Sequence, residues 1–394
     1  VKEELTAGKS VHASLKSGFQ KAMSAIVDGN ITTLIAAGVL WLRGSGTVKG
    51  FAQTLALGIV VSMFTALVIT RLIIFSFYGA GIHNEKVYGR HLKERKPVDF
   101  LGKKKIFFVI SIILCLAGPV MMGVNHARGI GAMNYSLDFV GGTSTNVTFD
   151  KEYTLEEIDS QMIPSLEEIT GDKNIQVQTV KDSNQVVFKT QTLDLEKREA
   201  LASYLNENYG VEASDIATEN ISSTVSSEMR RDAVIAVIIA TICMLLYIWF
   251  RFKDIRFATS AVIALVHDVL VVLGFYVIAR VSVGNTFIAC MLTIVGYSIN
   301  GTIVIFDRIR EALATKSRTE DLKDLVNRCI TQTLTRTIYT NFTTFVMVVA
   351  LYILGVSSIK EFAAPLMVGI ICGGYTSVCI TGALWYVMKT RLGE

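Results

Sequence analysis

The feature that most constrains this chain is an internal repeat, in which residues 17–70 recur without a gap as residues 328–381. Each residue of the second copy carries a number 311 higher than its counterpart. The matched pairs include Asn30 and Asn341, Thr32 and Thr343, Thr33 and Thr344, Lys49 and Lys360, Gly58 and Gly369, and Thr65 and Thr376. Both copies are largely apolar and long enough for two membrane crossings. Such a duplication around a soluble insert is typical of a pseudo-symmetric membrane transporter, whose working residues lie where the repeats face each other.

The composition also indicates a membrane protein. Hydrophobic residues make up 51% of the 394 residues and charged residues only 18%, which excludes an ordinary soluble enzyme and favours a polytopic membrane protein. A helical crossing needs about 20 mostly apolar residues. The segments that meet this requirement are 24–43, 51–77, 106–124, 233–250, 257–279, 286–306, 338–355 and 362–388.

Positive charge is concentrated in alternate connectors between these segments, above all in residues 86–105. By the positive-inside rule, these connectors are cytoplasmic. Both termini are then cytoplasmic and the insert, residues 125–232, lies outside. The basic run could instead bind nucleic acid, but topology and contact with lipid headgroups account for it. We therefore expect membrane lipids, and no nucleic acid, as partners.

The insert differs in kind from the rest of the chain, since residues 125–230 hold 18 acidic and 8 basic residues and none of the six cysteines. Neither a disulfide framework nor a cysteine metal site is indicated there. Strands are predicted at 147–149, 175–180, 186–188 and 216–225, and helices at 154–169 and 193–209. The order βαββαβ predicts a ferredoxin-like α+β domain.

The first five residues resemble residues 309–313, which follow a complete predicted crossing in the second half of the chain. The first copy therefore begins where a preceding helix is expected to end. We expect the chain to be a fragment, or its missing helices to come from another polypeptide.

Polar side chains form a stripe on the sixth predicted crossing. Thr293, Tyr297, Asn300 and Asp307 follow one another in steps of four, three and seven, which puts them on one helical face. Such a stripe is unfavourable in lipid and should face the bundle interior. Asn300 could be a functional group or a helix–helix hydrogen bond. Asp307 could be a functional carboxylate or a solvated charge at the membrane edge.

Three further sites carry ionisable groups in or beside predicted crossings. Arg336 opens the seventh, His267 and Asp268 lie near the middle of the fifth, and Asp28 lies in the first. An ionisable residue near the bilayer centre costs roughly 2.5–3.5 kcal/mol and is a functional candidate for that reason. For His267 and Asp268, proton handling and a paired structural bond are equally open.

Glycines mark two structural motifs. Gly369 and Gly373 have the GxxxG spacing that lets helices approach closely, so we interpret them as packing residues. Asp138, Gly141 and Gly142 precede the first predicted strand. They lack the lysine and helix start of a phosphate-binding loop, so we predict a tight turn there.

Several motifs together resemble the SecF component of the bacterial protein-export accessory complex. They are Leu137-Asp138-Phe139 with Gly141-Gly142-Thr143, His267-Asp268-Val269, Gly296-Tyr297-Ser298-Ile299-Asn300, Phe306-Asp307-Arg308-Ile309-Arg310-Glu311, and Arg336-Thr337-Ile338 with Thr340-Asn341. Residues 1–80 look like the last two membrane helices of SecD, including Asp28-Gly29-Asn30. The resemblance implies a basic linker at 81–105, a first SecF-like helix at 106–124, an external domain at 125–232 and a five-helix bundle at 233–394.

The resemblance implies the resistance–nodulation–division superfamily fold in the bacterial inner membrane. The implied partners are the SecYEG channel, SecA, the remaining SecD half and unfolded preproteins, and the implied activity is export assisted by the proton motive force. In the family, proton flow involves a membrane carboxylate in SecD, a second one directly after the Gly-Tyr-Ser-Ile-Asn motif, and an arginine on the next span. Arg336 matches that arginine, whereas Gly301 stands at the second carboxylate position. No cofactor or metal is implied.

Three hypotheses for coupling remain open at this stage. An upstream SecD carboxylate could do the coupling while Arg336 biases its protonation. Alternatively, Asp268 could carry the proton, with His267 or Arg336 as its partner. In the third, this half is a passive scaffold of the Sec channel. A small-molecule exporter of the same superfamily is disfavoured because an insert of about 100 residues is small for a substrate pocket. We expect no enzymatic activity, since the insert shows no catalytic motif.

Overall fold

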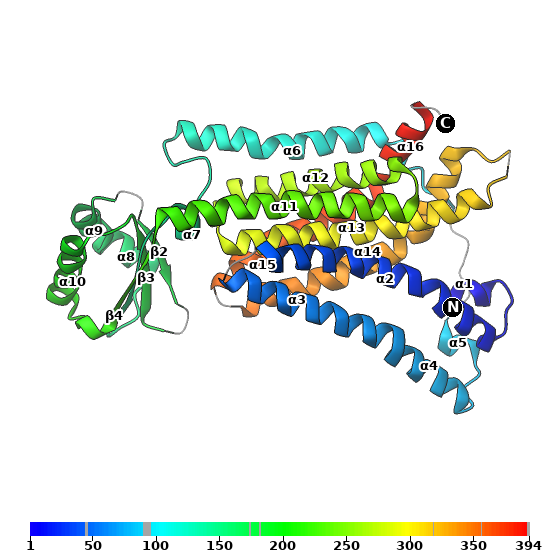
Figure 1. Ribbon diagram of the computed structural model, residues 1–394, viewed down its shortest axis with the longest axis horizontal. Coiled ribbons are helices and arrows are strands. Elements are labelled where there is room, and N and C mark those ends of the chain that lie inside the picture. The colour runs from blue at the N-terminus through cyan, green and yellow to red at the C-terminus, as the bar shows by residue number, and fades with distance from the viewer. Residues whose placement is uncertain are drawn as a thin grey trace.

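The fold is an elongated helical bundle with a small α+β domain at one end (Figure 1). The computed structural model describes residues 1–394 except 44–45, 90–95, 173–174, 181–182, 318, 356 and 392–394. Within these residues, eight helices are long and apolar enough to cross a membrane, as predicted. The α+β domain is inserted between the third and fourth of them.

The eight crossings are longer than the apolar segments of the sequence. They comprise α2 (Val11–Arg43), α3 (Gly46–Phe64) continued by a π-helical turn and α4 (Thr70–Gly79), α6 (Lys104–Ala127), α11 (Ser223–Phe252), α12 (Ile255–Ile278), α13 (Asn285–Ala314), α14 (Leu322–Leu354), and α15 (Ser357–Thr376) continued by a π-helical turn and α16 (Gly382–Arg391). Short helices form α1 (Lys2–Thr6), α5 (Glu85–Tyr88) and α7 (Leu137–Val140).

The predicted start of the seventh crossing at residue 338 was too late. Helix α14 begins at Leu322, where Asp321 caps it by accepting a hydrogen bond from the Lys323 amide at 3.3 Å. Hydropathy marks the apolar part of such a helix, but a polar stretch without proline or glycine continues it. Arg336 therefore lies near the middle of α14 rather than at its start.

The α+β domain has the predicted split βαβ topology. Its elements are β1 (Gly142–Thr148), α8 (Leu155–Gln161), α9 (Ile163–Thr170), β2 (Gln176–Thr179), β3 (Gln185–Thr190), α10 (Leu195–Tyr209) and β4 (Ile216–Ile221). The strands are antiparallel in the order β2-β3-β1-β4, which is the ferredoxin-like order that the βαββαβ pattern predicts. In this register Val147 lies opposite both Val186 and Ile216.

Three details of the domain were predicted wrongly. The single helix expected at 154–169 is interrupted at Met162, because Pro164 has no amide hydrogen to continue the helical ladder. The last strand ends at Ile221 rather than at residue 225, and the long helix α11 begins at Ser223. The first strand starts at Gly142, so only Gly141 forms the turn, with a φ of 83° at the end of α7.

The two repeats have the same local structure. The Asn30 side-chain amide donates to the Ile26 carbonyl at 2.8 Å, and its counterpart Asn341 donates to Thr337 at 2.9 Å. The helix pairs also meet at equivalent residues: the rings of Phe51 and Phe362 lie 5.5 Å apart. An isologous contact of this kind lies on a two-fold axis, so the sequence repeat is a structural pseudo-symmetry.

Helix α13 is the central helix of the bundle and is approached closely from two sides. On one side, a Cβ added to Gly296 would lie 3.1 Å from the Thr33 Cα of α2. On the other, a Cβ added to Gly373 of α15 would lie 3.1 Å from the Ser298 Cβ. Gly369, the other glycine of the predicted GxxxG motif, lies against Ile294. Small residues therefore set the distance of both repeats from α13.

The repeat offers a matched pair of packing variants. A Cβ at Gly369 would lie 2.5 Å from the Ile294 side chain, whereas at its repeat counterpart Gly58 it would meet nothing within 4 Å. We expect Gly369→Val to destabilise the folded chain by about 1–3 kcal/mol through overpacking. Gly58→Val should leave stability unchanged. Thermal unfolding in detergent compares the two variants, and equal losses would contradict the packing difference between the two positions.

The N-terminal helix is attached to α2 by an ion-pair cluster. Glu4 is buried beside Lys9, and its Oε1 lies 2.7 Å from the Lys21 Nζ. The hydrogen bonds from Lys21 and Lys9 lower the pKa of Glu4 from 4.5 to about 2. A carboxyl group with a lowered pKa stabilises the fold above its unfolded value, and this contribution is lost as the pH falls through the folded value.

We therefore expect the attachment of α1 to weaken between pH 4.5 and pH 2. In Glu4→Gln, this part of the pH dependence should be absent, because the group that takes up the proton is gone. Proteolysis of α1 as a function of pH measures the attachment, and Glu3→Gln, which changes a more exposed neighbour on the same helix, is the matched control. Identical acid profiles for natural chain and Glu4→Gln would contradict the assignment.

Candidate functional site

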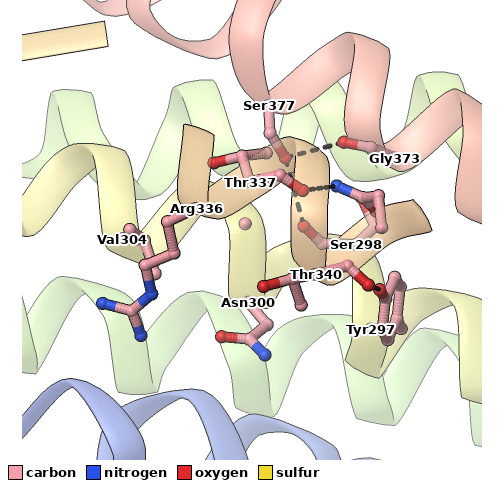
Figure 2. A pocket seen from close by; sticks show the side chains of 11 residues that line it. Tyr297, Ser298, Asn300, Val304, Arg336, Thr337, Thr340, Gly373 and Ser377 are labelled. Atoms are coloured by element: carbon pink, nitrogen blue, oxygen red, sulfur yellow. Dashed lines mark hydrogen bonds between the residues drawn. The ribbon is translucent and has the colours of Figure 1, made fainter. Parts of the chain in front are cut away.

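Two residues of the polar stripe of α13, Tyr297 and Asn300, line a small cavity of about 50 Å³ between α13, α14 and α15 (Figure 2). About 10–15 Å³ is needed to hold one water, so this space is sufficient for a few. The lining residues are Tyr297, Ser298, Asn300, Gly301, Val304, Arg336, Thr337, Thr340, Asn341, Gly373 and Ser377. Asn300 and Arg336, predicted from separate crossings, therefore lie at one site.

Arg336 lies at the outer edge of this cavity. Its side chain points away from the hydroxyl groups of Ser298, Thr337 and Ser377, as Figure 2 shows, and the residue is exposed. Among the described residues, Arg336 has no ion pair or hydrogen bond. An uncompensated guanidinium on a membrane helix is unfavourable, which makes Arg336 a candidate functional residue.

Gly301 also lines the cavity and has little room for a side chain. A Cβ at this position would lie 2.7 Å from the Ser377 Oγ and 3.2 Å from the Ser377 Cβ. Asn300, its neighbour, is directed at α2, where its Oδ1 lies 2.4 Å from the place that a Cβ of Gly29 would occupy. Helices α2, α13 and α15 therefore meet tightly at the two positions that follow the Gly-Tyr-Ser-Ile motif.

Asp268 of α12 lies in a hydrogen-bonded cage between α12, α13 and α15. The carboxylate is fully buried and accepts hydrogen bonds from the Ser298 hydroxyl, from Thr376 Oγ1 at 2.9 Å and from Cys372 Sγ at 3.1 Å. His267 Nδ1 lies 3.1 Å from the same carboxylate. Ser298 belongs to both the cage and the cavity lining, so the two polar sites are adjacent.

A third polar group joins α2, α11 and α13 at the end of the bundle away from the α+β domain. Asp28 accepts hydrogen bonds from Arg251 Nε at 2.7 Å and from Tyr247 Oη at 2.8 Å. Arg251 also reaches Asp307 at 3.4 Å, and Arg310 reaches Asp307 at 3.0 Å. Asp28 and Asp307, predicted from different halves of the chain, thus share one arginine and form a structural ion-pair network.

Four contributors were missed in the sequence. Arg251 was counted only as a topology signal, because its position at the end of a crossing fits the positive-inside rule. Ser298, Cys372 and Thr376 form the cage, but small polar residues are common in membrane helices and carry no charge signal. The sequence did single out Thr376, because the repeat pairs it with Thr65.

The structural motif before the first strand lies apart from all three sites. Asp138 belongs to helix α7, but its side chain is outside the described residues. Gly142 enters β1 directly, and a Cβ on it would lie 2.3 Å from the Thr190 carbonyl oxygen of β3. The motif therefore supports the start of the sheet.

One group of described residues has the spacing of a metal site. The donor atoms of His267, Asp268 and Cys372 all lie within 4.8 Å of one another. Both carboxylate oxygens of Asp268 are already engaged by hydrogen bonds from Ser298, Thr376 and Cys372. Protein hydrogen-bond donors therefore surround the Asp268 carboxylate, as water molecules surround a carboxylate in solution.

Residues 201–391 match the family described as "Protein export membrane protein SecD/SecF, C-terminal". The chain is 34% identical over 412 residues to the protein translocase subunit SecDF of Bacillus subtilis (strain 168), covering 99% of this chain and 54% of that protein. It is 36% identical over 309 residues to the subunit SecF of Calditerrivibrio nitroreducens, covering 76% of this chain and 96% of that protein.

A solved structure agrees with these sequence matches. The crystal structure of SecDF, a translocon-associated membrane protein from Thermus thermophilus, superimposes with a TM-score of 0.82 at 34% identity, covering 99% of this chain and 52% of that one. A SecDF structure in a super-membrane-facing form gives a TM-score of 0.73. The chain thus spans about half the length of the SecDF relatives that it matches. The shared sequence, fold and near-complete coverage of SecF show that this chain belongs to the SecD/SecF family of multi-pass protein-export membrane proteins.

Proposed function

We propose that this chain is the part of a Sec translocase accessory protein in which a proton gradient is converted into movement that assists preprotein export. The translocase role follows from the family. The coupling to the proton motive force is supported by one observation above all: Arg336 is an exposed cation on a membrane helix beside a water-sized cavity.

The pseudo-symmetry indicates where the partner of Arg336 lies. Helix α2 packs against α13, and α14 is the repeat counterpart of α2. Helix α2 meets α13 through Gly29 and Thr33. The equivalent face of α14 carries Arg336 together with the exposed residues Thr340 and Met347. A counterpart of α13 from the remaining SecD half fits this face. A carboxylate on that helix would then pair with Arg336.

Such a pair can respond to a proton gradient. One elementary charge crossing 100 mV is worth about 2.3 kcal/mol. Protonation of the carboxylate would remove its attraction to Arg336, so the proton-bound and proton-free states would favour different helix arrangements. Helix α15 lines the same cavity, and Glu361 in its second turn accepts a hydrogen bond from Gln178 of β2 at 3.0 Å. This contact links α15 to the α+β domain.

The positive-inside rule supports an orientation in which the α+β domain lies outside the bacterial inner membrane and both ends of this chain are cytoplasmic. In that orientation the domain would meet preprotein emerging from the SecYEG channel, on the side opposite the SecA motor. No enzymatic step is proposed.

A passive scaffold is the second candidate, and Gly301 favours it. The cavity has a glycine where the family has a carboxylate, and Ser377 occupies the space that a side chain would need. In that case, this half would stabilise the channel assembly without moving charge.

Replacement of Arg336 distinguishes these functions. In inverted membrane vesicles containing the complete protein, preprotein translocation should be faster with a proton gradient than without it. We expect Arg336→Ala to abolish this difference, because the proton-sensitive pair is lost. Arg328→Ala is the matched control, since Arg328 lies on the same helix but pairs with Glu320 at 2.7 Å. A gradient effect that survives Arg336→Ala would leave the scaffold as the better explanation.

Introducing a carboxylate at Gly301 tests the second candidate. The new Cβ would clash with Ser377, so Gly301→Ala and Gly301→Asp should both lose about 1–3 kcal/mol of stability in thermal unfolding. If coupling runs through Arg336 and its partner, neither variant should be more gradient-dependent than the natural chain. If only Gly301→Asp responds to the gradient in the translocation assay, the natural chain is a scaffold.

A further inference from the structure

Asp268 is a buried carboxylate whose nearest basic group is a histidine, His267, with Nδ1 at 3.1 Å. Among the described residues, no lysine or arginine pairs with it, whereas Asp28 and Asp307 share Arg251. Asp268 has no exposed surface, and hydroxyl and thiol donors surround it. Asp268 is therefore the carboxylate of this site that could take up a proton without breaking a pair with arginine or lysine.

The titratable groups around Asp268 come from three helices. On α12 itself, His267 Nδ1 lies 3.1 Å away, and its Nε2 is buried without a hydrogen-bond partner among the described atoms. On α15, the Cys372 thiol donates to Asp268, and the Tyr375 ring lies 6.3 Å from the His267 ring. On α6, the Cys115 thiol is close enough to interact with Asp268 electrostatically. Helix α13 contributes the Ser298 hydroxyl, which does not titrate.

Ser298 links Asp268 to the cavity. The residue lines the cavity, and its hydroxyl donates to Asp268 Oδ2. When a hydronium ion in the cavity gives its extra proton to Ser298 Oγ and becomes water, the hydroxyl can pass its own proton to Asp268. The serine is then unchanged, and the carboxylate becomes a carboxylic acid. The reverse sequence releases the proton. The cavity itself offers Asn300 and Gly301, neither of which can titrate.

We propose that Asp268 is a proton-binding site of this half of the protein, loaded and emptied through the Ser298 hydroxyl. This inference rests on the proposed function and names a group within it. Protonation of Asp268 would change the hydrogen bonds that hold three helices together. An ionised Asp268 holds Ser298 of α13 and Thr376 of α15 as donors, whereas the neutral acid is a weaker acceptor. Proton uptake therefore loosens the junction of α12, α13 and α15, directly beside the π-helical turn Ser377–Thr381.

The alternative is that Asp268 stays ionised at all times and has a structural role only. Both interpretations predict that Asp268→Asn impairs export, so activity alone does not separate them. Protonation is read directly from the carbonyl stretch of a carboxylic acid in infrared difference spectra of the 394-residue chain in liposomes. We expect a band that appears on acidification and is absent in Asp268→Asn. Asp159→Asn, an exposed position of the α+β domain, is the matched control and should keep the band.

A second variant tests the chemistry without removing the carboxylate. Ser298→Ala removes a donor that stabilises the ionised form, so the band should persist to higher pH and form more slowly after a pH jump. A band unaffected by Asp268→Asn, or natural-chain and Ser298→Ala spectra that titrate identically, would overturn the proposal. One zinc ion per purified chain that is lost in Cys372→Ser would also overturn the proposal, because His267, Asp268 and Cys372 would then form a metal site.

The outcome for Asp268 is separable from that for the whole function. If translocation by the complete protein depends on the gradient but the Asp268 band never titrates, the proton site proposed here is wrong and the coupling function stands. If the band titrates as expected but translocation ignores the gradient, the coupling function fails while Asp268 remains a proton-binding group. Asp268→Glu, which keeps a titratable group, should retain the band where Asp268→Asn loses it.

Discussion

The close approach of α13 to both repeats is the constraint on which the other features depend. Gly296 brings α2 against α13, and Gly373 brings α15 against it from the other side. Because both contacts are made by backbone and small side chains, the polar groups of α13 lie at helix junctions rather than in lipid. Ser298 can then reach the carboxylate of Asp268 and the cavity at once. A bulky residue at either junction would separate these groups.

The carboxylates of the bundle differ in how their charge is compensated. Asp28 and Asp307 have arginines as partners and lie near one end of the bundle, so they suit a stable connection between α2, α11 and α13. Asp268 is held by hydroxyl and thiol donors and by His267, and Arg336 has no described partner. Burial of a charge carries a desolvation penalty that an oppositely charged partner can offset. That asymmetry separates the structural ion pairs from the candidate coupling groups.

The fold was largely predictable from the sequence, whereas the site was only partly so. Hydropathy and the repeat of residues 17–70 as 328–381 identified eight crossings and their pseudo-symmetry, since both signals are spread over many residues. The cage around Asp268 was not predictable, because it joins residues 298, 372 and 376 through tertiary contacts. Helix periodicity placed Asn300 on an inward face correctly, but it could not show that Arg336 lies across the cavity from it.

Equivalent residues of the two repeats make different contacts. Gly58 and Gly369 occupy the same repeat position, yet one faces open space and the other faces Ile294 of α13. In the same way, Gly29 of α2 touches Asn300, whereas its counterpart Thr340 of α14 lines the open side of the cavity. Helix α14 thus presents to its surroundings the surface that α2 buries against α13. A helix resembling α13, contributed by the other half of the SecDF relatives, would complete the symmetry and enclose Arg336.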